Sequence, residues 1–84
     1  MGSSNVLQTS FDPRSFWQEV NPVLRQGGRE MLDFASDKAE LIDSYNRMDR
    51  SLARLVEMYN PPEYVRMQLL ARINDKVDIL IKRL

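Results

Sequence analysis

The stretch from Arg29 to Tyr59 contains neither Pro nor Gly, and its large apolar residues recur at alternating intervals of three and four. This spacing places the apolar side chains along one side of an α-helix. The series is Met31, Phe34, Leu41, Tyr45, Met48, Leu52, Leu55 and Tyr59, with Lys38 at its one polar position. The pattern predicts a single long helix over 29–59 with a coiled-coil-like seam.

The sequence Asn60-Pro61-Pro62-Glu63 predicts a tight turn at 60–62. Pro61 disfavours the α conformation at Asn60, whose side chain is expected to cap the next helix while Glu63 answers from the third helical position. The second helix is expected to run to Leu84, with a seam at Leu70, Ile73, Val77, Leu80 and Leu84. So short a connection favours an antiparallel hairpin.

An N-terminal helical arm is expected over 11–28. Asp12 can serve as its N-cap and Pro13 as its first helical residue, while Phe11 and Phe16 stand at the two positions of a hydrophobic staple. Asn21-Pro22 either ends this helix or kinks it.

Gly27 and Gly28 are weak helix formers, and the pair predicts a hinge between the arm and the long helix. Residues 1–10 are small and polar apart from Val6 and Leu7, and they are expected to form a flexible tail. The predicted fold is therefore all-α, a single domain over 11–84 built as a helical hairpin with an arm.

Further large apolar residues lie off both seams and need another surface to cover them. One interpretation is that the arm folds back and makes a three-helix bundle. The other is that the surplus residues contact further copies of the chain or another protein. The expected partner contacts are Phe16, Trp17, Val20, Leu24, Ile42, Val56, Val65, Leu69 and Ile79. Trp17 is the best single anchor, because buried Trp residues dominate the energetics of many interfaces.

The chain of 84 residues has no Cys and no His. Their absence removes disulfides, thiolate and imidazole metal sites, and the Ser–His and Cys–His pairs of nucleophilic catalysis. We therefore expect a protein that is not an enzyme and has no metal or cofactor. No apolar run approaches the length of a membrane span and no signal peptide is visible. Residence in the cytoplasm is expected, unless a route that needs no cleavable signal exports the chain.

Twelve basic residues balance twelve acidic ones, but the charges are separated along the long helix. Its first half holds Glu30, Asp33, Asp37, Glu40 and Asp43, and its second half holds Arg47, Arg50 and Arg54. Complementarity to the helix dipole and local pairs explain this order within one chain. The alternative is a staggered interface at which acidic and basic halves of two subunits meet.

The C-terminal stretch from Asn60-Pro61-Pro62-Glu63 through Gln68 to Leu84 resembles the last helix of small axial subunits of bacterial type III secretion systems and of the flagellar rod. The shared features are the Asn-Pro turn, the Gln several residues later and the terminal apolar helix. The resemblance implies a subunit that packs with copies of itself or with export components, or a small helical chaperone of such a subunit.

The function expected from the sequence is protein–protein contact by a small helical subunit or adaptor that self-assembles or docks on a larger complex. A DNA-binding transcriptional regulator is the alternative from another class. It would use the basic residues of the last helix, Arg66, Arg72, Lys76, Lys82 and Arg83.

Overall fold

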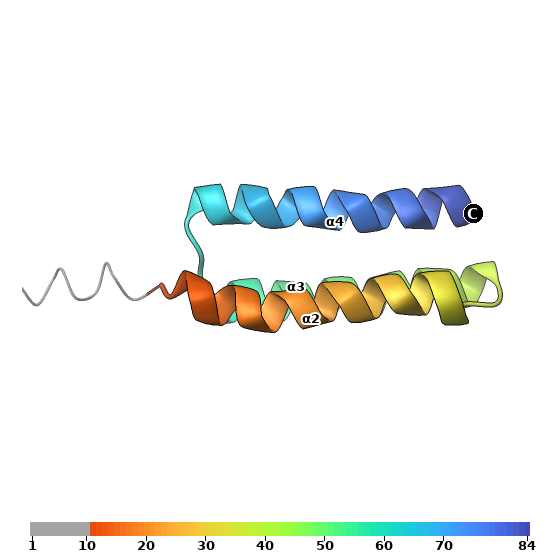
Figure 1. Cartoon of the computed structure of the whole chain (residues 1–84), viewed down its shortest axis with the longest axis horizontal. Coiled ribbons are helices and arrows are strands. Elements are labelled where there is room, and N and C mark those ends of the chain that lie inside the picture. Colours follow the sequence, from red (N-terminus) through yellow and green to blue (C-terminus); the bar gives the residue numbers. More distant parts are fainter. Residues whose placement is uncertain (1–10) are drawn as a thin grey trace, which may run out of the picture.

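The computed structural model describes residues 11–84, and within them the chain forms three long helices and no strand. The elements are α2 (Pro13–Arg29), the π-helical turn η1 (Glu30–Phe34), α3 (Lys38–Tyr59) and α4 (Glu63–Arg83). Each helix contacts the other two, and α3 runs antiparallel to both α2 and α4 (Figure 1). The all-α prediction is confirmed, and of the two arrangements left open the chain adopts the three-helix bundle. The predicted flexible tail, 1–10, lies outside the described residues.

The start of α2 is the one that the sequence predicts. Asp12 is the N-cap, and its Oδ1 accepts hydrogen bonds from the backbone N–H of Arg14 at 3.1 Å and of Ser15 at 3.4 Å. A hydrogen bond from the Ser15 hydroxyl helps to lower the pKa of the Asp12 carboxyl. The rings of Phe11 and Phe16 meet edge to face with centroids 5.6 Å apart, as expected for a staple. The helix continues through Pro22 to Arg29.

The hinge predicted at Gly27 and Gly28 is wrong, because both residues lie buried inside α2. A Cβ built on Gly27 would stand 2.5 Å from Sδ and 2.9 Å from Cβ of Met48, far inside van der Waals contact. Gly27 therefore allows α2 to approach α3 closely. Glycine lowers the stability of a helix, and its presence at position 27 is explained by this close packing and not by a need for flexibility. Gly28 lies beneath the side chain of Lys76 on α4.

The single helix predicted over 29–59 is also wrong, because the chain reverses direction between Phe34 and Lys38. Asp37 adopts extended backbone angles and caps α3, accepting a 2.7 Å hydrogen bond from the Glu40 N–H. The Glu40 carboxylate reaches back to the Ser36 N–H and to the Ser36 hydroxyl, and these bonds hold its pKa below the ordinary value. Such reciprocal hydrogen bonds are typical of the first turn of a helix. Here they start α3 inside the apolar pattern that predicted one continuous helix.

Arg83 closes the same end of the bundle from α4. Its guanidinium donates hydrogen bonds to the carbonyl oxygens of Leu32, at 3.3 Å, and Ala35, at 3.1 Å. Carbonyl groups at the end of a helix have no partner within it, so Arg83 supplies the donors that the interrupted helix lacks.

The tight turn at 60–62 is confirmed, but Asn60 has a different role from the one expected. Its backbone is left-handed, with φ of 48°, and it ends α3 instead of capping α4. Arg66 fastens the turn by donating to the Asn60 side-chain oxygen and to the Pro61 carbonyl, both at 2.9 Å.

Eight buried apolar side chains from all three helices form the main core. They are Phe16, Val20 and Leu24 of α2, Met48, Leu52 and Leu55 of α3, and Val65 and Leu69 of α4. A smaller cluster of Met31, Ala35 and Leu41 lies toward the opposite end, with Ile79 and Leu80 of α4 packed against it. The seam predicted for α3 is confirmed from Leu41 onward. The seam predicted for α4 is wrong at Leu70 and Leu84, which are half exposed, while Val65 and Leu69 enter the core in their place.

Replacing Gly27 with Ala should destabilise the bundle by about 1–3 kcal/mol, because the new methyl group overlaps Met48 and overpacks the contact between α2 and α3. Gly28→Ala is the matched control. Its Cβ would lie 3.4 Å from the flexible end of Lys76, so the gain in helix propensity, up to about 1 kcal/mol, should dominate. Urea unfolding followed by circular dichroism measures both changes, and equal effects at the two positions would contradict the close-approach role of Gly27.

Replacing Asp37 with Ala should lower the free energy of unfolding by about 1 kcal/mol, because the first turn of α3 loses its cap. Asp33→Ala changes an exposed aspartate of η1 in the preceding turn and should alter stability by less than about 0.5 kcal/mol. Thermal unfolding of the two variants side by side tests this. Indistinguishable melting temperatures would argue against a capping role for Asp37.

Candidate protein-binding surface

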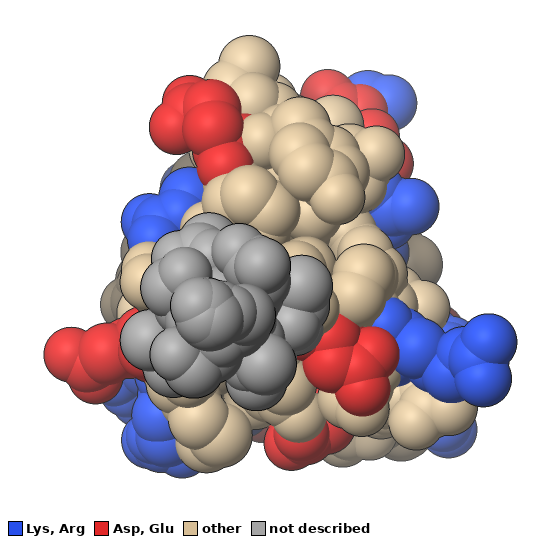
Figure 2. Space-filling view, turned by 90° about the vertical axis from the view of Figure 1, so that its left-hand side faces the viewer, with Lys and Arg blue, Asp and Glu red and all other residues tan. Residues whose placement is uncertain are grey.

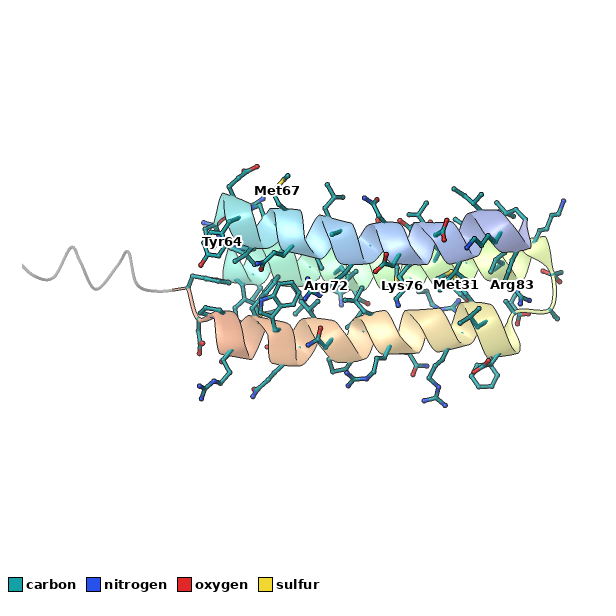
Figure 3. All side chains as sticks on the ribbon, turned by 45° about the horizontal axis from the view of Figure 1, so that its top comes forward. Met31, Tyr64, Met67, Arg72, Lys76 and Arg83 are labelled. Carbon is teal, nitrogen blue, oxygen red and sulfur yellow. The ribbon has the colours of Figure 1, made fainter. Side chains whose placement is uncertain are left out.

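One side of α4 carries a row of exposed apolar side chains that the bundle does not cover. Met67 is 58% exposed, Leu70 51%, Ile81 63% and Leu84 50%. Exposed Asn74 and half-buried Val77 complete the row. We call the six residues the α4 stripe. Figure 3 shows Met67 pointing away from the bundle, whereas Arg72 and Lys76 point toward α2.

The α4 stripe has the spacing of a second heptad seam, with intervals that alternate between three and four. In heptad terms Met67, Asn74 and Ile81 share one position and Leu70, Val77 and Leu84 the other. A single Asn among apolar residues is a feature of helix-pairing seams, in which it favours one register over others. The row therefore has the composition of a surface that packs against another helix.

The neighbouring surface of α3 continues this face of the molecule. An open concavity of about 640 Å³ lies between α3 and the start of α4, and Arg50 and Ala53 line it from α3 while Arg66 lines it from α4. Residues seven positions apart share a helix face, so Asn46 lies on the same side of α3 as Ala53, and Asp43 on the same side as Arg50. Ile42, 42% exposed, lies one turn before Asn46. We call this surface, together with the α4 stripe, the α3/α4 face.

Seen from the end at which α2 and α4 begin, acidic and basic side chains alternate around the rim of the bundle, with other side chains between them (Figure 2). No single sign of charge covers this end. Mixed charge of this kind gives little general attraction to a polyanion.

The basic residues of α4 are largely engaged within the chain. Arg66 fastens the turn, and Arg83 caps the end of η1. The guanidinium of Arg72 lies 4.5 Å from the ring centre of Trp17, and Lys82 pairs with Asp78 at 3.0 Å. These contacts give the positive charges of α4 a structural role, which weakens the argument for a DNA-binding helix.

The structure divides the nine partner contacts expected from the sequence. Five are buried in the main core and cannot contact a partner while the bundle is folded, so their assignment is wrong: Phe16, Val20, Leu24, Val65 and Leu69. Trp17, Val56 and Ile79 are half-buried and pack against the clusters. Ile42 is exposed and lies on the α3/α4 face.

The α4 stripe takes the place of those residues as the candidate surface. Its spacing was visible in the sequence, but α4 has two interleaved apolar rows, and the spacing alone does not say which row enters the core. The choice depends on α2, which packs against Val65 and Leu69 from a distant part of the chain.

A second concavity, of about 430 Å³, lies between α2 and α3 and contains an ion pair. Arg47 lies 3.1 Å from the Glu30 carboxylate, which also accepts a 2.8 Å hydrogen bond from Gln26. The Gln26 bond and then Arg47 lower the pKa of Glu30, so this carboxyl stays ionised and is poorly suited to act as a general acid or base near neutral pH. Among residues 11–84 no group of three or more acidic side chains could hold a metal ion.

Within the described part of the chain, no helix combines the length and the apolar character needed to cross a membrane. No protein-family model, curated protein or solved structure matches the chain. The fold and its exposed surfaces therefore carry the argument about function.

Trp17 belongs to the internal packing of the bundle, so Trp17→Ala should destabilise the monomer by about 1–3 kcal/mol. Its ring lies edge to face with Phe16, at 5.2 Å between centroids, and beneath Arg72. Arg72→Ala should cost about 0.5–1 kcal/mol through loss of the cation–π contact. Denaturant unfolding gives both values. A Trp17→Ala variant of unchanged stability would return Trp17 to the set of partner contacts.

Proposed function

We propose that this chain is a protein-binding module without catalytic activity, a small helical subunit or adaptor whose α3/α4 face packs against another protein. The α4 stripe is the observation that carries the proposal. Four apolar side chains of the stripe are half exposed or more. Covering them with a second surface removes apolar area from water, which is favourable by about 25 cal/mol per Å².

The size of the domain supports the proposal. A core of eight buried residues and a satellite of three is small, and single cores in chains of this length give only about 3–5 kcal/mol. Association through an additional apolar face is a common way to add stability when disulfides and metals are absent.

The resemblance of residues 60–84 to axial subunits of secretion systems and the flagellar rod, or to a chaperone of them, stays a prediction. The α4 stripe lies within those residues, so a subunit of either kind would use the same surface. The geometry favours protein contact over DNA binding, because the arginines of α4 are committed to contacts within the bundle.

Photo-crosslinking in cells that produce the protein tests the proposal without knowledge of the partner. A photoreactive phenylalanine analogue replaces Leu70 in one variant and Leu32 in another. The two leucines are equally exposed, at 51% and 52%, but Leu32 lies in η1, outside the α4 stripe. We expect strong crosslinks to protein from position 70 and weak ones from position 32.

Met67 and Met58 provide a second matched pair, with exposures of 58% and 64% on α4 and α3. Crosslinks should form at position 67 and be weak at position 58. Equal yields within both pairs would mean that the α4 stripe is ordinary solvent-exposed surface, and the proposed function would be wrong.

A further inference from the structure

We infer that the α3/α4 face binds a second copy of this chain in an antiparallel dimer with twofold symmetry. In this dimer α4 packs along α4 of the second copy and α3 packs along its α3. The inference deepens the proposed function, on which it rests, by naming the partner and the register. Two independent patterns, one on each helix, support it.

The α4 stripe is symmetric about its own centre, between Asp75 and Lys76. An antiparallel pair of helices aligns residues that lie equally far from that centre on opposite sides. The resulting layers are Met67 with Leu84, Leu70 with Ile81, and Asn74 with Val77. Every outer layer thus joins two large apolar residues that are half exposed in the monomer.

Asn74 lies next to the twofold axis in this arrangement. The Asn74 side chains of the two copies then lie within one helical turn of each other, close enough for their amides to hydrogen bond across the axis. A register shifted by one heptad would place both amides against Leu70 or Leu84 of the second copy, without partners. The polar residue in the stripe therefore disfavours the alternative registers.

One pair of charges on α3 fits the same antiparallel arrangement. Glu40 and Asp43 precede Arg47, Arg50 and Arg54, although Lys38, Asp49 and Glu57 depart from this order, so a second α3 of opposite direction brings the former acids close to the latter arginines. Asp43 then lies opposite Arg50, and Glu40 lies one residue from the position opposite Arg54. Ala39 lies one residue from the position opposite Ala53, and these small residues let the two α3 helices approach closely.

The centres of the two patterns coincide in space. The midpoint between Asp43 and Arg50 on α3 falls at about Asn46, and the centre of the α4 stripe falls at about Lys76. Both positions are equally far from Pro61, the middle of the turn, so they lie side by side in an antiparallel hairpin. One twofold axis therefore aligns the apolar row of α4 and pairs Asp43 with Arg50 of the second copy on α3.

The direction of pairing follows from charge. Parallel copies would bring Asp43 beside Asp43 and Arg50 beside Arg50, and like charges across an interface are unfavourable. The antiparallel copy instead completes a four-helix core from two α3 and two α4 helices, with each α2 on its outer side. This is an interface of one chain with itself, closed by symmetry.

The first test measures the mass of the purified full chain by light scattering after size exclusion, over a range of loading concentrations. We expect a concentration-dependent shift from 9.8 kDa toward twice that mass. Leu70→Gln should raise the dissociation constant at least tenfold, because each copy loses an apolar layer. The equally exposed Leu32→Gln should leave it unchanged. Circular dichroism confirms that both variants stay folded.

The second test exchanges the charges of the pair between Asp43 and Arg50. Asp43→Arg alone and Arg50→Glu alone should each weaken the dimer about tenfold, since each sets two like charges against each other twice per dimer. The double variant carrying both changes should regain most of the lost affinity. Asp43 and Arg50 are two helical turns apart within one chain, so recovery reports contact between copies.

The outcomes separate this inference from the proposed function. A chain that stays at 9.8 kDa up to about 1 mM, or a double variant that regains no affinity, overturns the antiparallel dimer. Crosslinks from position 70 to a different protein would then leave the proposed function standing with another partner. Open-ended assembly to larger species would also overturn the dimer, because a twofold interface closes on itself.

Discussion

The reversal of the chain at Ser36 and Asp37 determines the architecture of this protein. Without it, the apolar pattern from Met31 to Tyr59 would extend as one helix and leave α2 with nothing to pack on. The reversal depends on a few polar contacts: Asp37 accepts from the Glu40 N–H, and Glu40 accepts from Ser36. Each cap is worth only about 1 kcal/mol. The caps are sufficient to favour the reversal because a single long helix would leave Phe16, Val20 and Leu24 unburied, without their contacts to α3 and α4.

Once α2 folds back, it decides which side of α4 faces inward. Its close approach to α3 through Gly27, and its contacts with the first half of α4, draw Val65 and Leu69 into the core. The second half of α4 is held less deeply, by Ile73, Ile79 and Leu80, which stay partly exposed. The other apolar row of α4 is consequently turned outward. The composition of the α4 stripe is thus a consequence of three-helix packing.

These dependencies explain how far the sequence predicts the structure. Local signals were sufficient for the N-cap at Asp12, the staple of Phe11 and Phe16, and the turn at Asn60, because each depends on neighbours within a few residues. The reversal at Asp37 also has a local signal, the capping pattern completed by Glu40, but a strong apolar period runs across it. The inward row of α4 has no local signal at all.

Gly27 and the predicted partner contacts show the same limit. A glycine in a helix predicts a hinge unless the residue that packs against it is known. For Gly27 that residue is Met48, which is distant in sequence, so local patterns do not reveal the contact. Phe16, Val20 and Leu24 read as surplus apolar residues because nothing in their spacing says that their own chain covers them. After the bundle closes, exposed apolar residues remain on α4, but they are not Val65 and Leu69, which the sequence suggested. Burial of one row of an amphipathic helix leaves the other row exposed.

The zero net charge of the chain takes on a definite meaning in this fold. On α3, Glu40 and Asp43 lie nearer the helix start than Arg47, Arg50 and Arg54, which suits the helix dipole, and in the proposed dimer Asp43 faces Arg50 of the second copy. Exposed ion pairs contribute little to affinity, while like charges brought together at an interface are costly. In the proposed dimer the charges of α3 therefore act mainly on direction and register, and the apolar side chains of α4 supply most of the free energy of association. Such a division of roles would give a small bundle with a modest core a specific partner through a surface that its own fold leaves uncovered.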